Sequence, residues 1–350
     1  MPRREDPHQQ TLFGDSPEAH REAAPSTARG KSSRAPECVA IDEPTAALAR
    51  AIPASIRLGT SSWSFPGWRG IVWDRDTTEA SLARHGLRAY GAHPLLRTVG
   101  IDKTYYRPAP REEFERLRSQ VPDGFSFLVK AHEAITHREP MSANAQGASL
   151  WLDPKYATDQ VIQPAVDGLG ASAGPILFQF SPMGIHAAPS AEGFIREVGA
   201  FLAALPQGPL YAVEVRDRAL LRPSWGAMLA DTGAVHCYSV HPKQGGPLMQ
   251  AKIADPNVQR AIVCRWMLHS GLSYNQAVDR YQPFDRIVDP DPTSRDGFAR
   301  LCEMAAQAHK HSFVIINNKA EGSAPRSVRL LAETIAALVL GHPPRRNRHA

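Results

Sequence analysis

Eight short apolar segments, each followed by polar residues and most of them separated by helical patterns, constrain the fold of this chain more than any other feature. The segments are rich in β-branched and aromatic residues, which predicts strands. They span residues 56–62, 95–101, 125–129, 175–180, 210–216, 234–240, 260–267 and 312–316. Strands that alternate with helices predict an α/β fold, and eight such units predict a TIM (β/α)8 barrel.

An open doubly wound sheet is the alternative architecture. That fold commonly carries a glycine-rich phosphate loop after a strand. Neither G-x-G-x-x-G nor G-x-x-x-x-G-K-[ST] follows any of the eight segments, which favours the closed barrel.

The barrel is expected to occupy residues 54–342. Residues 1–53 are rich in Arg, Pro, Ser, Ala and Glu without lasting periodicity, so we expect a disordered N-terminal tail. Residues 343–350 form a basic C-terminal tail. Within the barrel, residues 138–157 are expected to be a long polar insertion, and a helix over residues 158–169 should be interrupted or offset near Pro164.

The third segment shows the polarity of a barrel strand most clearly. Residues 125–129 are mostly apolar, whereas Lys130, His132, Glu133 and His137 follow at the carboxyl end. In α/β barrels the catalytic and binding residues lie on this face, at the carboxyl ends of the strands. The other segments bring further polar side chains to the same end: Asp102, Tyr106, Gln179, Glu214, Arg216, Arg265, Asn317 and Asn318.

These strand ends predict an anion site with acid–base chemistry. Lys130, Arg216 and Arg265 around one mouth would suit a phosphate or a sugar acid. Glu214 is the predicted general base, and the other catalytic candidates are Lys130, Asp102 and His137. The predicted substrate-binding residues are Tyr106, Gln179, Arg216, Arg265, Asn317, Asn318 and Trp63.

Two alternatives to this chemistry stay open at the level of sequence. Glu214 could pair with Arg216 or Lys130 in a structural salt-bridge network. The aromatic loop at residues 63–70, which begins with Trp63, could be a ligand lid or a hydrophobic plug.

No metal or cofactor is indicated. Glu214 and Asp102 are the only well-placed carboxylates at the mouth, and metal sites in related barrels use several His and carboxylate ligands. We therefore expect no catalytic metal, and no cofactor can be named.

Charge and cysteine content add weak constraints. The net charge of +5, with Arg-rich segments at both termini, would give at most a generic, salt-sensitive affinity for nucleic acid. The four cysteines are scattered without a C-x-x-C pair, which suits a reducing cytoplasm. The sequence lacks an apolar run long enough for a transmembrane helix and an apolar N-terminal signal region, so we expect no membrane association.

An apolar pair stands out in the N-terminal tail. Residues Gln9 to Phe13 read Gln-Gln-Thr-Leu-Phe, which resembles the pentapeptide by which bacterial repair proteins bind the replicative sliding clamp. A chance match, or a tail that packs on its own barrel, is the alternative interpretation.

Six motifs in order resemble one family. They are Gly59-Thr60-Ser61-Ser62-Trp63, Thr104-Tyr105-Tyr106-Arg107, Pro122 to Lys130 with Ile135-Thr136-His137, Gly174 to Phe180, Val213-Glu214-Val215-Arg216-Asp217, and Ile316-Asn317-Asn318. Residues 55–340 are similar in this way to domain of unknown function 72, the YecE-like family. The resemblance implies a TIM barrel but no settled activity.

The chain departs from that family at two places. The family usually carries V-E-x-N where this chain has Val99-Gly100-Ile101-Asp102, and it usually has a His-Gly pair soon after the arginine that corresponds to Arg265. The loss of a glutamate at position 100 puts any shared chemistry in doubt.

Two functional hypotheses follow. The first is an enzyme that acts on a phosphorylated or sugar-like substrate, with Glu214 and Lys130 as acid–base groups. The second is an accessory protein associated with nucleic acid, recruited through the clamp-like peptide.

Overall fold

Eight parallel strands close into a barrel in chain order, with β8 hydrogen-bonded to β1. The structure is a computed structural model that describes residues 34–138, 149–240 and 244–341. The strands are β1 (Ile56–Thr60), β2 (Thr98–Ile101), β3 (Ser126–Lys130), β4 (Ala173–Gln179), β5 (Tyr211–Glu214), β6 (Val235–Ser239), β7 (Ala261–Trp266) and β8 (His311–Ile316). Each overlaps its predicted segment, so the (β/α)8 barrel is confirmed.

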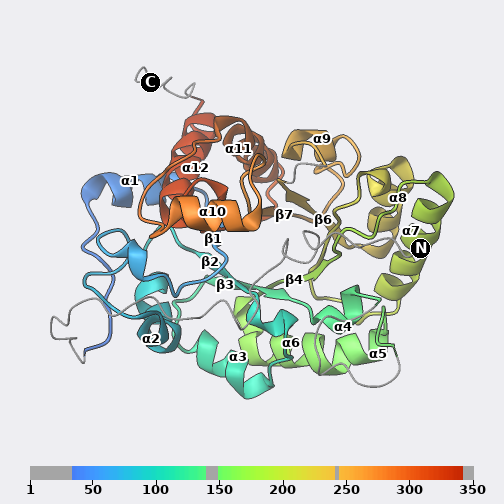
Figure 1. Ribbon diagram of the computed structural model, residues 1–350, viewed down its shortest axis with the longest axis horizontal. Coiled ribbons are helices and arrows are strands. Elements are labelled where there is room, and N and C mark those ends of the chain that lie inside the picture. Colours follow the sequence, from blue (N-terminus) through green and yellow to red (C-terminus); the bar gives the residue numbers. More distant parts are fainter. Residues whose placement is uncertain (1–33, 139–148, 241–243, 342–350) are drawn as a thin grey trace, which may run out of the picture.

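Helices surround this barrel (Figure 1). They include α2 (Glu79–Gly91), α3 (Arg111–Arg118), α6 (Gln163–Leu169), α7 (Ala188–Ala203), α8 (Pro223–Thr232), α11 (Pro292–Gln307) and α12 (Ala324–Val339). Further α-helices are α1 (Glu43–Ala51), α4 (Glu133–Thr136), α5 (Pro154–Ala157), α9 (Pro247–Ala251) and α10 (Tyr274–Tyr281). Short 3-10 turns are η3 (Pro66–Trp68), η4 (Lys103–Tyr105), η6 (Gly170–Ser172), η7 (Arg218–Leu220) and η8 (Asn318–Ala320).

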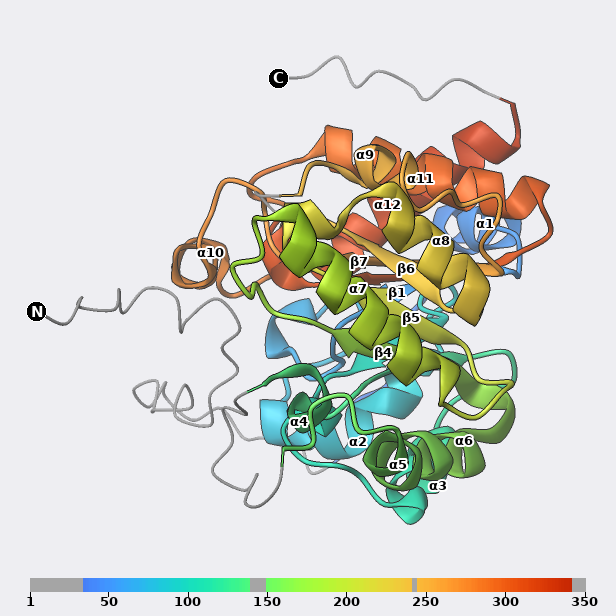
Figure 2. The ribbon, with the colours of Figure 1, turned by 90° about the vertical axis from the view of Figure 1, so that its right-hand side faces the viewer.

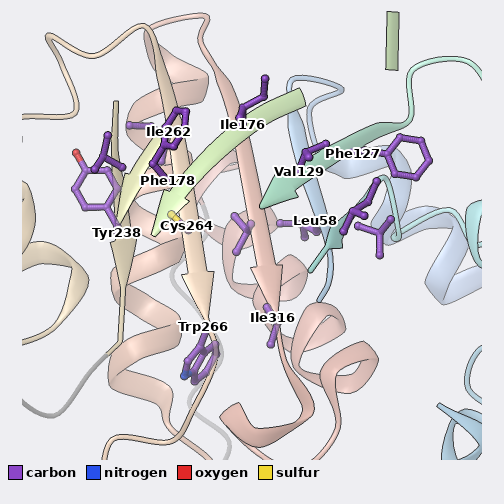
Figure 3. Close-up of a cluster of buried hydrophobic side chains, with 14 of the residues drawn as sticks. Leu58, Phe127, Val129, Ile176, Phe178, Tyr238, Ile262, Cys264, Trp266 and Ile316 are labelled. Atoms are coloured by element: carbon purple, nitrogen blue, oxygen red, sulfur yellow. The ribbon is translucent and has the colours of Figure 1, made fainter. Parts of the chain in front are cut away.

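The strands place apolar side chains on both of their faces. In β4, Ile176 and Phe178 pack in the layer between the sheet and the helices, whereas Leu177 belongs to a second cluster inside the barrel. Figure 3 shows part of the outer layer, with Phe178 projecting from β4 and Trp266 from β7. Because side chains alternate along a strand, every second residue of each strand faces the barrel interior.

Helix α1 corrects the predicted extent of the N-terminal tail. Asp42 caps the helix by accepting a hydrogen bond from the Thr45 amide at 2.9 Å. Arg97 donates to the backbone oxygens of Ala49 and Ile52, which ties the helix to the bottom of the barrel. Residues 43–51 are therefore ordered by capping and by a distant arginine, neither of which appears as a periodic apolar pattern.

The connections also differ in detail from the prediction. The helix near Pro164 is offset and not interrupted, because a π-helical turn, η5 (Thr158–Ile162), comes immediately before α6. Helix α10 was not predicted. It begins with a capping box of Ser273 and Gln276, and Figure 2 shows it apart from the ring of longer helices.

Several predictions concern residues outside those described. The clamp-like peptide at residues 9–13 and the basic tail at residues 343–350 both lie there. All four cysteines lie inside the described ranges, and none forms a disulfide. Over the same ranges, each helix is too short or too polar to cross a bilayer.

Candidate functional site

A layer of polar side chains lies at the carboxyl ends of the strands, directly above the apolar barrel interior. Leu128, Leu177, Ala212 and Val263 fill the interior, and the residue two positions later on each strand carries the polar group. These residues are Lys130, Gln179, Glu214 and Arg265. Strand periodicity points them to the same side as the interior layer, so four polar groups from different strands meet at one mouth.

Glu214 is the centre of this layer and is fully buried. Arg265 Nη1 donates to Glu214 Oε2 at 2.6 Å, and the Arg216 guanidinium forms an ion pair with the other oxygen, Oε1. Burial alone would raise the pKa of the Glu214 carboxyl, but the two arginines hold that pKa below its usual range. Glu214 is therefore an ionised counter-ion with both oxygens engaged.

Arg265 links three strand ends. In addition to its bond to Glu214, Arg265 donates from Nη1 to Gln179 Oε1 at 3.1 Å. Its Nη2 lies 3.4 Å from Asp102 Oδ1. Asp102 follows β2 and is partly exposed, whereas Arg265 is buried. The structure thus brings Asp102, Gln179, Glu214, Arg216 and Arg265 into one connected network.

Lys130 lies beside this network without an ion-pair partner among the described residues. Its Nζ sits 3.5 Å from the centre of the Tyr105 ring, a cation–π contact, and the side chain is only 8% exposed. Burial lowers the pKa of Lys130 to about 8, with Arg265 and Arg216 acting in the same direction and Asp102 and Glu214 opposing it. A lysine with this pKa exchanges its proton near neutral pH.

His137 lies next to the Tyr105 ring. Its Nε2 is 2.8 Å from the Tyr105 hydroxyl and 3.0 Å from Ser181 Oγ. Burial, and then the charge of Lys130, lowers the pKa of His137, so the imidazole is mostly neutral at pH 7. Lys130, Tyr105, His137 and Ser181 therefore form a second group of exchangeable protons beside the charged network.

Tyr105 and Ser181 were not among the predicted site residues. The tyrosine pair Tyr105-Tyr106 suggested Tyr106, but the 3-10 turn η4 directs the ring of Tyr105 toward Lys130, and Tyr106 packs edge-on against it. Ser181 comes two residues after Gln179, and this spacing at the end of a strand was the signal that could have identified it.

The remaining predicted residues lie in other environments. Asn317 donates to Ser61 Oγ at 2.7 Å, between the ends of β1 and β8. Asn318 Oδ1 accepts from Trp68 Nε1 and from the Ala324 amide, so this buried amide supports the aromatic loop and the start of α12. Trp63 is 9% exposed and packs in the outer core.

The aromatic loop packs mainly as a plug. Trp68 and Trp73 are fully buried and stack on each other, and Phe65 packs against Trp68 and Phe284. Within the described ranges, no three His, Cys, Asp or Glu side chains gather as metal ligands would.

Comparisons with known proteins agree with this architecture. The model of the family described as "Protein of unknown function DUF72" matches residues 57–348. A DUF72 family protein from Enterococcus faecalis has a similar structure, with a TM-score of 0.55 and 17% identity over 80% of this chain and 95% of that one. A DUF72 family protein from Thermotoga maritima gives a TM-score of 0.55 and 17% identity over 80% and 98% of the two chains. No curated protein matches the sequence.

Proposed function

The chain belongs to the DUF72 family of proteins of unknown function, and we propose that its barrel is an enzyme that acts on a small phosphorylated or sugar-like substrate. The site is the mouth of the barrel, and the reaction is acid–base chemistry there. The observation that carries this proposal is the position of Lys130, a buried amine over the Tyr105 ring without an ion-pair partner among the described residues. Burial lowers the pKa of this amine to about 8. Enzymes tune lysines to this range when a proton must move at neutral pH.

Lys130 is a better acid–base group than Glu214 in this arrangement. Both oxygens of Glu214 are held by arginines, and taking up a proton would break a buried ion pair. Glu214 would instead keep the arginines charged and fixed. Asp102 and His137, both partly exposed, remain as further proton-transfer groups.

The charges at the mouth favour an anionic ligand. Lys130, Arg216 and Arg265 supply three positive charges when Lys130 is protonated, whereas Asp102 and Glu214 supply two negative ones. Within this group of five side chains one positive charge is unbalanced, and the buried Glu133 lies outside the group, near Tyr105. Electrostatic attraction is strong in a buried setting. A phosphate or carboxylate group would neutralise it.

Gln179 offers a donor for a hydroxyl group of the ligand. Its side chain is buried, Oε1 is bound to Arg265, and Nε2 has no hydrogen-bond partner among the described residues. A buried amide hydrogen without a partner carries a free-energy cost that a ligand oxygen would remove. Tyr106 would contact the outer part of the ligand, and Asn317, Asn318 and Trp63 would act by supporting the loops around it.

A thermal-shift titration tests the proposal. The full chain would be titrated with phosphosugars, sugar acids, nucleotides, short DNA and divalent metals. We expect stabilisation by an anionic sugar, because a ligand that binds the folded state raises the melting temperature. Lys130→Met should remove this shift and Lys155→Met should keep it, since Lys155 is exposed and pairs with Asp159. Equal shifts in both variants would overturn the proposal.

A second candidate role rests on the peptide Gln9 to Phe13. An accessory protein recruited to a sliding clamp would use this Leu-Phe pair, and the role is compatible with an enzymatic barrel and with the cytoplasm. Deletion of residues 1–20 should abolish binding of the full chain to a bacterial clamp in surface plasmon resonance. Unchanged binding, or no binding by the intact chain, would exclude this role.

A further inference from the structure

Lys130 differs from the other lysines that the structure describes. The others are exposed or only partly buried, and most have polar partners: Lys103 pairs with Glu113, Lys155 with Asp159, and Lys310 donates to backbone oxygens. Lys319 also contacts an aromatic ring, that of Tyr274, but it is only partly buried. Lys130 is buried, and its charge faces the Tyr105 ring in place of a carboxylate. The chain contains eight lysines in all, so the reactivity of this one can be separated from the rest.

The surroundings of Lys130 favour the neutral amine. Arg265 and Arg216 are fixed cations close to it, and the negative charges of Asp102 and Glu214 are already engaged by these arginines. A neutral amine is a nucleophile toward carbonyl carbon, and proteins activate lysines for this role by desolvation or by a neighbouring cation. Desolvation by burial has the largest effect on the pKa of Lys130; the cations Arg265 and Arg216 act in the same direction, and Asp102 and Glu214 oppose them.

We propose that Lys130 forms an imine with an aldehyde or ketone, so that the substrate is a small carbonyl compound that also carries an acidic group. This inference rests on the proposed function and names its substrate class. The carbonyl group would react with Nζ, and the acidic group would occupy the positive field of Arg216 and Arg265.

The step balances without any further reagent. The lone pair of Nζ forms a bond to the carbonyl carbon, the carbonyl oxygen takes up a proton, and the nitrogen loses one of its two protons, which gives a carbinolamine. That hydroxyl group then leaves as water with a second proton, while the nitrogen loses its proton and forms the C=N bond. One amine and one carbonyl compound become one imine and one water.

The protons for this step have a source beside Lys130. The Tyr105 ring contacts Nζ, its hydroxyl is bonded to His137 Nε2, and Ser181 Oγ reaches the same nitrogen. Burial, with the nearby Glu133, raises the pKa of Tyr105, so its hydroxyl stays protonated. Tyr105 and His137 could deliver a proton to the departing oxygen and recover it from bulk water through Ser181.

Reductive trapping tests the inference directly. The full chain would be incubated at about pH 8 with glyoxylate, a small aldehyde acid, and reduced with sodium borohydride, which converts an imine to a stable amine. Peptide mapping by mass spectrometry should find the adduct on Lys130, labelled at least about tenfold faster than exposed Lys252, because far more of a low-pKa amine is neutral. Glycolate, which lacks the aldehyde, should give no adduct.

Two variants separate this inference from the proposed function. Lys130→Arg keeps the positive charge but cannot form an imine, so it should lose the adduct and keep stabilisation by a sugar acid. Lys130→Met should lose both. Mapping of the unaltered chain needs neither variant to fold.

Three results would contradict the inference or its basis. Labelling of Lys130 no faster than that of Lys252, or its absence on Lys130, overturns the imine. The proposed function would still stand after such a result if an anionic sugar raises the melting temperature of the unaltered chain but not that of Lys130→Met. Labelling of Lys130 without stabilisation by any sugar or phosphosugar would keep the imine and overturn the proposed substrate.

Discussion

Arg265 on β7 and Glu214 on β5 meet across the barrel mouth, although 51 residues separate them, with Nη1 and Oε2 at 2.6 Å. Strand β6 lies between their strands, so the contact crosses the barrel and does not follow a neighbouring pair. Both side chains are almost completely buried. The pair fixes the charged network, and Lys130 is left beside it as the cation that can change its protonation.

Replacement of Glu214 should therefore reduce stability strongly. Glu214→Gln leaves Arg265 and Arg216 buried beside a neutral amide, and breaking a buried ion pair from one side lowers the free energy of unfolding by about 3–5 kcal/mol. Chemical denaturation measures this quantity. Glu333→Gln removes a half-exposed partner of Arg329 and should change it by less than about 1 kcal/mol. Similar small losses in both variants would show that Glu214 is not a structural counter-ion.

The polar layer could be predicted because strand periodicity determines it. Lys130, Gln179, Glu214 and Arg265 each end a strand at a fixed spacing from an interior residue, and parallel strands bring these ends together. The pairing of Glu214 with Arg216 was one of the two interpretations that the sequence allowed, and the structure contains that ion pair.

The parts that could not be predicted depend on loop geometry. Whether Tyr105 or Tyr106 faces Lys130 is decided by the backbone angles of the turn η4, which have no periodic pattern. His137 meets Ser181 only because the loops after β3 and β4 converge, 44 residues apart in sequence. Helix α1 is held by hydrogen bonds from two distant arginines, Arg97 and Arg329.

The pH dependence of stability should reveal the lowered pKa of Lys130. Its pKa is about 8 in the folded chain and 10.5 ordinarily. The unfolded chain therefore binds more protons between about pH 8 and 10.5, and the contribution of Lys130 to stability rises with pH across this window. We compare the free energy of unfolding of the wild type with that of Lys130→Met. The difference, wild type minus variant, should increase by on the order of 3 kcal/mol between about pH 8 and 10.5.

Lys155 provides a control of opposite sign. Its hydrogen bond with Asp159 raises its pKa, so its contribution is present below its ordinary pKa and falls as pH rises further. Urea denaturation at several pH values measures both differences. A wild-type minus Lys130→Met difference that is flat up to about pH 10 would show that the Lys130 amine has an ordinary pKa.

Asn318 should contribute to the stability of the folded chain and not to direct contact with a ligand. Asn318→Ala would leave the Trp68 indole N–H and the Ala324 amide without their acceptor. An unpaired buried donor costs about 1–3 kcal/mol, so we expect a loss of at least about 2 kcal/mol in thermal or chemical denaturation. Asn257→Ala, at an exposed residue whose side chain bonds only its neighbour Asp255, should change stability little. Comparable effects at both positions would mean that Asn318 does not support the aromatic loop.

The family departure at Gly100 can be tested by adding a side chain there. Gly100 lies on β2 opposite Leu128 and two residues before Asp102, so it faces the barrel interior just below the polar layer. A Cβ at this position would meet Ser61 Cα at 3.4 Å and Ile315 Cγ2 at 3.6 Å, which are ordinary contacts. The backbone at Gly100 is not in the left-handed region.

Gly100→Ala should consequently be tolerated and raise the free energy of unfolding by about 0.4–1 kcal/mol, because alanine restricts the unfolded chain. Gly59→Ala is the matched comparison on neighbouring β1, where a Cβ would collide with the Thr98 backbone oxygen. That variant should lose about 1–3 kcal/mol or more, since backbone cannot move aside easily. Chemical denaturation of both variants decides the point. A large loss at Gly100 would mean that the interior beneath Asp102 is already full, and that no glutamate could have occupied this position without a different packing of β1 and β8.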